Sequence, residues 1–175
     1  MSKSLLSKYQ GADGGRRLIE TLQAQSLVQE RVLAAELARV VKPELIPAGQ
    51  ILIEQGSRGK DLFLILSGTF AIKVDGQVIS QPGPKQYIGE IGLLDPKGRR
   101  SAAVVATTNS VVARAKAADF CALADKYPRL WRTIATDLAL RLLKGAEPSV
   151  RPGDTYGNTS KATSTSDISA SPSVG

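Results

Sequence analysis

The sequence predicts an α+β fold in which an antiparallel β sandwich or small barrel lies between two helical segments. Two observations carry this prediction. Apolar residues recur at spacings of three and four before about residue 41 and again after about residue 116, as on one face of a helix. Between those positions, short β-like runs alternate with turns that contain Gly or Pro, which is typical of a sandwich or barrel.

The first helical segment is expected over residues 14–46 and is expected to pack on the domain that follows. Leu18 shares a helical face with Leu22, and Leu33 shares one with Leu37. The stretch 25–30 is expected to divide the segment into two helices. Prolines 43 and 47 are expected to end it, because proline cannot continue a helix.

The β region begins with QILIEQG at Gln50, in which apolar and polar residues alternate. DLFLILSG, which starts at Asp61, is a nearly continuous apolar run and predicts a buried strand. Asp75-Gly76 separates two further β-like runs and is the strongest short signal for a β hairpin. Residues 101–115 predict two more short strands.

The second helical segment is expected from about Lys116 to Ala146. Pro128 suits the first turn of its longer helix. An apolar stripe follows at helical spacing: Trp131, Ile134, Leu138 and Leu142. The stripe is expected to support a homodimer or higher oligomer through the terminal helices. Residues 147–175 are rich in Ser, Thr, Gly and Pro, which predicts a disordered tail or linker.

The composition excludes several kinds of site. The 175 residues include no histidine and one cysteine, which removes His-dependent triads, most zinc sites and an internal disulfide. Carboxylate or lysine chemistry remains open, but the sequence contains no obvious pair of such residues. We expect no enzyme, no metal and no cofactor, and a cytoplasmic location. No apolar run approaches the ~18 residues that would span a membrane. The net charge of +7 is scattered along the chain, so DNA binding is not expected, but the positive field would attract an anionic ligand.

The stretch GEIGLLDPKGRRSAAV, which starts at Gly89, combines the features of an anion site. Gly89 and Gly92 allow close approach to the backbone, and the apolar run after Glu90 is long enough for one helical turn, whose N-terminus favours an anion. Asp95 begins a Pro- and Gly-containing turn that brings Arg100 back to the same point. Arg100 can bind a phosphate through two N–H donors, and Glu90 can accept a hydrogen bond from a sugar hydroxyl. The expected ligand therefore carries a compact anion beside a sugar.

GEIGLLDPKGRRSAAVVA resembles the phosphate-binding cassette of the cyclic nucleotide-binding domain family. The upstream run AGQILIEQGSRGKDLFLILSGTFAIKV resembles the first strands of that family, and DFCALADKYPRLWRTIATDLALRLL resembles its closing helices. The resemblance implies that residues 47–146 are a cyclic nucleotide-binding domain with an eight-stranded jelly roll and flanking helices. It also implies that the ligand is a 3′,5′-cyclic mononucleotide.

Carried onto this chain, the resemblance assigns the cyclic phosphate to Arg100 and the ribose 2′-hydroxyl to Glu90. It assigns the other positions to the binding turn, to the phosphate or base edge, and to the apolar wall around the base: Gly89, Ile91 and Gly92; Ser101 and Ala102; Ile72 and Ile79. The last helix, near Arg141, would lie over the base.

Some assignments have alternatives. Arg99 could hold the phosphate in place of Arg100, although Arg100 directly precedes Ser-Ala. Glu90 could serve only to cap the following turn. Trp131 is expected to belong to the core rather than to stack on a base. Arg141 is expected to be a solvated helix residue rather than a ligand contact.

The resemblance implies a sensor or regulatory module, because this family joins the barrel to a separate output domain. GRRLIETLQAQSLV near the start and LADKYPRLWRTIATDLALRL near the end are similar to sensor domains of TIR-linked bacterial anti-phage effectors. That similarity implies a sensor for cyclic CMP or cyclic UMP with a TIR-like output domain. The alternatives are an interaction module with a degenerate pocket and a basic nucleic-acid binder. The sequence does not mark which base is preferred.

Overall fold

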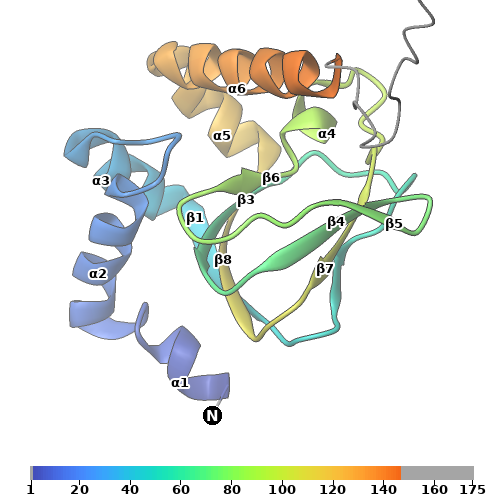
Figure 1. Cartoon of the computed structure of the whole chain (residues 1–175). Helices are drawn as coiled ribbons and strands as arrows, with labels where there is room; N and C mark the ends of the chain where they lie inside the picture. Colours follow the sequence, from blue (N-terminus) through green and yellow to red (C-terminus); the bar gives the residue numbers. More distant parts are fainter. Residues whose placement is uncertain (1, 147–175) are drawn as a thin grey trace, which may run out of the picture.

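Two four-stranded sheets packed face to face form the centre of the computed structural model, which describes residues 2–146 (Figure 1). In spatial order, the first sheet contains β1 (Val41–Ile46), β8 (Ser110–Ala115), β3 (Leu62–Ser67) and β6 (Tyr87–Ile88). The second contains β2 (Ile51–Ile53), β7 (Ala103–Ala106), β4 (Phe70–Val74) and β5 (Gln77–Ser80). Every pairing between these strands is antiparallel. The expected eight-stranded jelly roll is thus confirmed.

Strand β3 explains why the run DLFLILSG is almost continuously apolar. Its alternate residues face two different cores, as the period of a strand requires. Leu62, Leu64 and Leu66 belong to the core beneath the helices, whereas Phe63 and Ile65 belong to the core between the sheets. All five are at most 6% exposed, and full burial of such a side chain contributes roughly 1.5–3 kcal/mol. The central strand therefore holds both layers together.

The β4–β5 hairpin turns at Asp75-Gly76, as the sequence predicts. φ is 50° at Asp75 and 82° at Gly76, and two positive φ values at the central positions characterise a type I′ turn. The turn places Ile72 of β4 opposite Ser80 of β5. This hairpin forms one wall of the cavity described below.

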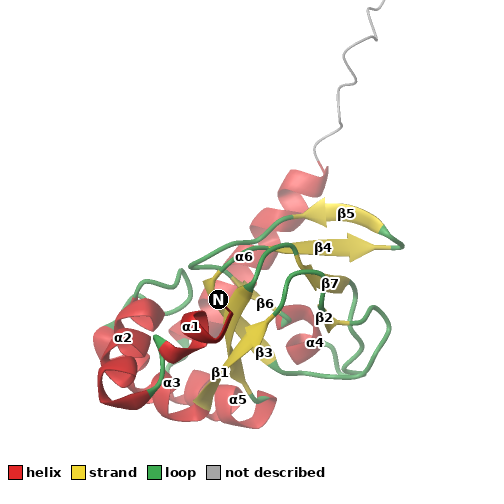
Figure 2. Cartoon of the chain, turned by 90° about the horizontal axis from the view of Figure 1, so that it is seen from below, coloured by secondary structure: helices red, strands yellow, loops and turns green. Residues whose placement is uncertain are grey.

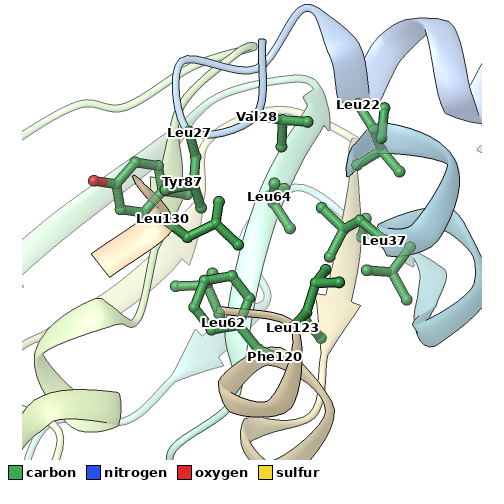
Figure 3. Close-up of a cluster of buried hydrophobic side chains, with 14 of the residues drawn as sticks. Leu22, Leu27, Val28, Leu37, Leu62, Leu64, Tyr87, Phe120, Leu123 and Leu130 are labelled. Carbon is green, nitrogen blue, oxygen red and sulfur yellow. The ribbon is translucent and has the colours of Figure 1, made fainter. Parts of the chain in front are cut away.

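The helices pack outside the sheets. They are α1 (Ser2–Ser7), α2 (Gly11–Gln23), α3 (Arg31–Val40), α4 (Glu90–Leu94), α5 (Ala117–Lys126) and α6 (Arg129–Ala146). Figures 1 and 2 show α1, α2 and α3 grouped on one side of the sandwich and α4 towards the other. Figure 3 shows Leu22, Leu37, Leu64, Phe120 and Leu130 converging in the core beneath the helices. The expected break over residues 25–30 is confirmed, since α2 ends at Gln23 and α3 begins at Arg31.

The helical segment expected up to residue 46 ends earlier, at Val40, and the chain continues as β1. Pro43 was expected to end a helix, but it lies inside this strand opposite Ala113 of β8. β1 is an edge strand with one neighbour, and proline is tolerated there because its missing N–H can face away from the partner. The apolar pattern alone does not show whether residues 41–46 continue the helix or form an edge strand.

The apolar stripe of α6 is only partly buried. Ile134 is fully buried and Trp131 packs edge-on against Phe120 with ring centroids 5.9 Å apart, so Trp131 belongs to the core as expected. Leu142, at the end of the stripe, is 75% exposed, because the helix extends past the core that covers its first turns. The predicted tail of residues 147–175 lies outside the described residues.

Side-chain contacts anchor the start of α6 to the N-terminal helices. Arg129 pairs with the Glu30 carboxylate and donates to the Val28 carbonyl oxygen. One residue before Pro128, the Tyr127 hydroxyl donates to Glu36 of α3 at 2.8 Å. These contacts fix the direction in which α6 runs, and that direction takes its later turns past α4 (Figure 1).

Candidate ligand-binding site

A tight loop around α4 brings Glu90 and Arg100 together. Gly89 precedes α4 with φ of 95°, a left-handed conformation that favours glycine. After α4, the Asp95 carboxylate accepts the backbone N–H groups of Lys97 and Arg99, each at 3.0 Å. These two bonds hold the pKa of Asp95 below its ordinary value. The turn predicted from Asp-Pro-Lys-Gly is thus formed, and it returns the chain to α4.

The Arg100 side chain is buried and held in one orientation. It is 7% exposed and donates from Nη1 to the Gly89 carbonyl oxygen at 3.0 Å and from Nη2 to the Asp61 carbonyl oxygen at 2.9 Å. Its guanidinium lies 6.0 Å from the centre of the Phe63 ring. Burial lowers the pKa of Arg100. Arg99, the alternative phosphate ligand, is exposed.

The cassette glycines make room for this arginine. A Cβ atom on Gly92 would lie 2.8 Å from Arg100 Nη1 and 2.8 Å from the Gly59 carbonyl oxygen. One on Gly89 would lie 2.7 Å from the Asp61 carbonyl oxygen. From the sequence, these glycines were expected to let the ligand approach the backbone closely. In the structure, they instead leave space for the Arg100 side chain and for the loop before β3.

Glu90 meets a partner that was not expected. Its carboxylate is buried and pairs with the Arg141 guanidinium from α6. Arg141 was expected to be a solvated helix residue, but it lines the cavity. One turn earlier on α6, Asp137 accepts a hydrogen bond of 2.6 Å from the Tyr87 hydroxyl. Burial and this carboxylate raise the pKa of Tyr87.

A cavity of about 250 Å³ lies between the second sheet, α4 and α6. Its lining includes each residue that the sequence assigned to the ligand: Ile72, Ile79, Gly89, Glu90, Ile91, Gly92, Arg100, Ser101 and Ala102. It also includes residues outside that assignment: Ile53, Val74, Ser80, Pro82, Gln86, Tyr87, Ile88, Val104 and Arg141. Small-molecule sites usually measure about 300–1,000 Å³, so the cavity suits a compact ligand.

The cavity has a charged end and an apolar wall. Arg100, Ser101 and the α4 turn form the charged end, while isoleucines and valines of the second sheet and of β6 form the wall. Within residues 2–146, no cluster of three or more acidic, Cys or His side chains could hold a metal ion. None of the helices over the same residues is both long and apolar enough to cross a membrane. The arrangement therefore suits an organic anion with a flat apolar part.

Residues 43–127 match the family described as the cyclic nucleotide-binding domain. This barrel belongs to that family. The match spans β1 to the end of α5 and includes the whole α4 loop. The domain is thus a cyclic nucleotide-binding regulatory fold, and the matched residues include the segment that brings Glu90 and Arg100 to one cavity.

Two curated relatives extend the similarity beyond the barrel. The chain is 34% identical over 139 residues to the Pycsar effector protein XpPycTIR of Xanthomonas perforans, covering 79% of this chain and 46% of that protein. It is 33% identical over 141 residues to the Pycsar effector protein BcPycTIR of Burkholderia cepacia, covering 80% of this chain and 46% of that protein. The chain therefore spans less than half the length of these relatives.

A solved structure agrees with the fold. The catabolite activator protein of Thermus thermophilus superimposes with a TM-score of 0.57 at 30% identity, over 63% of this chain and 53% of that chain. The fold class therefore rests on the sequence match and on the structural match together.

Proposed function

We propose that the cavity binds a 3′,5′-cyclic mononucleotide, with the phosphate on Arg100 and the ribose 2′-hydroxyl on Glu90. The observation that carries this proposal is that both side chains are buried, at 7% and 4% exposure, yet line one cavity. Glu90 already pairs with Arg141, whereas the hydrogen bonds of the Arg100 guanidinium go to neutral carbonyl oxygens. A ligand with an anion next to a hydroxyl would give the buried Arg100 a negative partner and would give the remaining lone pairs of Glu90 a donor.

The contacts of Arg100 prepare it for this task. Its guanidinium carries five N–H donors, and the Gly89 and Asp61 carbonyls use one each. The N–H groups that remain can reach a phosphate while the backbone contacts hold the plane of the group. Ser101 adds a hydroxyl on the same side of the cavity. An arginine fixed before binding loses little side-chain freedom when the anion arrives.

We further propose that the chain is the cytoplasmic sensor part of a TIR-linked anti-phage effector that responds to cyclic CMP or cyclic UMP. The support is the similarity to two Pycsar effector proteins over 79–80% of this chain. In this proposal the barrel binds and a TIR-like domain acts, so the described residues carry no catalytic group.

Titration calorimetry with the cyclic mononucleotides of A, G, C and U tests the binding proposal, with the matching 5′-monophosphates as controls. We expect a cyclic pyrimidine nucleotide to bind more tightly than its open form. Arg100→Ala is expected to weaken binding about a hundred- to a thousandfold, because it leaves a desolvated phosphate unpaired. Arg99→Ala, the matched control, removes an exposed charge and should cost little. Equal losses in both variants, or no binding by any of the four nucleotides, would overturn the proposal.

We also propose that two copies of the chain associate through α6. Three leucines near its end are exposed: Leu140 at 50%, Leu142 at 75% and Leu143 at 66%. Light scattering of the free and nucleotide-bound chain tests this. A monomeric mass in both states would exclude the association.

A further inference from the structure

The cavity lining contains a glutamine whose amide oxygen is held by a backbone N–H group. Gln86 lines the cavity immediately before β6. Its Oε1 atom accepts the backbone N–H of Gly83 at 2.8 Å. Only the amide oxygen can accept this bond, so the amide NH₂ group is the end that remains for another partner. In residues 2–146 the hydrogen bonding of this side chain is confined to that one bond.

The loop around Gln86 is anchored and keeps the residue in place. The Gln86 carbonyl oxygen accepts the N–H of Ile65 at 2.9 Å, and the Lys85 N–H donates to the Ile65 carbonyl oxygen at 3.3 Å. On its outer side, the Lys85 carbonyl oxygen accepts the N–H of Ser26 at 3.0 Å. Lys85 has a φ of 71°, a conformation that side chains rarely adopt. These bonds hold the loop against β3 and the segment between α2 and α3.

The position of Gln86 suits the far end of a nucleotide bound at Arg100. Arg100 donates to Asp61, whereas the Gln86 backbone pairs with Ile65. These two points lie four residues apart along β3, which is about 13 Å at the rise of a strand. The Gln86 side chain lines the same cavity and is exposed to solvent at its rim. Ile72 and Val74 line the cavity as well and can contact the face of a base.

We propose that Gln86 determines base specificity by donating a hydrogen bond to the base, and this rests on the proposed function of the cavity. A fixed donor matches a carbonyl oxygen and opposes an amino group. Uracil and guanine carry a carbonyl oxygen at the position where cytosine and adenine carry an amino group. Gln86 therefore selects keto bases over amino bases, and among the pyrimidine nucleotides it selects cyclic UMP over cyclic CMP.

Gln86→Glu is the sharpest test, because a carboxylate oxygen can still accept the Gly83 N–H and keep the turn. The oxygen that faces the cavity then accepts but cannot donate. The added negative charge opposes every anionic ligand, so the informative quantity is a ratio of affinities. Gln81→Glu is the matched control, since it introduces the same charge in the same loop at a residue outside the cavity lining.

The experiment measures dissociation constants of the four cyclic nucleotides by calorimetry for the wild type and both variants. We expect the wild type to favour UMP over CMP, and GMP over AMP, by about five- to tenfold each, the size of one hydrogen bond. In Gln86→Glu both ratios should invert, while in Gln81→Glu both should stay at the wild-type value. If Gln86→Glu still binds the nucleotides with unchanged affinity ratios, the proposed role of Gln86 is overturned, while the proposed function of the cavity stands. If no cyclic nucleotide binds the wild type, the proposed function fails and this inference fails with it.

Discussion

The Arg141 guanidinium on α6 pairs with the buried Glu90 carboxylate on α4, so a charge from the last helix sits at the ligand cavity. Glu90 is also the residue expected to accept a hydrogen bond from the ribose. A carboxylate has about four lone-pair positions, so the sugar hydroxyl and Arg141 can bind it together. The ion pair therefore neutralises Glu90 without blocking it.

Arg141→Ala should weaken cyclic nucleotide binding about tenfold. The variant leaves the carboxylate of Glu90 uncompensated, and an unpaired negative charge opposes an anionic ligand at short range. Arg132→Ala is the control, because Arg132 is exposed on the same helix and does not line the cavity. Calorimetry checks both variants. Tighter binding in Arg141→Ala would mean that the pair competes with the ribose, contrary to this account.

Arg100→Ala should also destabilise the free protein. The substitution removes the Arg100 donors from the Gly89 and Asp61 carbonyl oxygens, of which Gly89 keeps the longer bond from the Leu93 N–H at 3.4 Å. A buried polar group that loses its partner costs roughly 1–3 kcal/mol. The sequence alone predicts little loss, because water could solvate an arginine in an empty pocket. Chemical unfolding of Arg100→Ala and Arg99→Ala, without nucleotide, distinguishes the two expectations. Equal free energies of unfolding would favour the solvated arginine.

Gly92→Ala should impair binding without removing any ligand contact. The new methyl group would meet Arg100 Nη1 and the Gly59 carbonyl oxygen, both at 2.8 Å, and overpacking of this kind costs about 1–3 kcal/mol. Arg100 has to move, so affinity should fall along with the melting temperature. Gly15→Ala on α2 is the matched control, since its Cβ would meet no atom within 4 Å. The free energy of unfolding of Gly15→Ala should rise by roughly 0.5–1 kcal/mol. A loss of nucleotide affinity in that variant would show that any Gly→Ala change weakens binding, whatever its place.

Local chemistry made much of the fold predictable. The hairpin at Asp75-Gly76 follows from a residue pair that accepts positive φ, and the buried strand β3 follows from its apolar run. The helix break before Arg31 was also visible. The strand β1 was not, because Pro43 reads as a helix terminator, and only the pairing with β8 shows it to be an edge-strand residue.

The site residues also fall into those that a local motif identifies and those that it does not. Gly89, Glu90 and Arg100 lie within twelve residues of one another, so a sequence motif could place them in one cavity. Arg141 and Gln86 reach that cavity from other elements. Their approach depends on the direction of α6 and on the loop before β6, and no local pattern encodes either. The contacts of Arg100 with backbone carbonyls are equally non-local, since Asp61 lies 39 residues away along the chain.

The turn at Asp95 should make the stability of the cassette depend on pH. Its carboxylate accepts two backbone N–H groups, and these bonds lower its pKa in the folded protein. Because the folded pKa lies below the unfolded value of about 3.9, the contribution is complete above that value. It is lost as the pH falls through the folded pKa, when the proton displaces an N–H donor.

Asp95→Ala therefore should lower the melting temperature at pH 7 and at pH 5 by the same amount, because the carboxylate is ionised at both values. Below about pH 4 the gap between wild type and variant should narrow, since the wild type then loses the same two bonds. Thermal melts of both proteins from pH 7 down to about 3 measure the gap. Nucleotide affinity should fall in the variant as well, because this turn carries the chain from α4 back to Arg100. A gap that stays constant into acid would show that the charge of Asp95 contributes nothing and that only the shape of the loop matters.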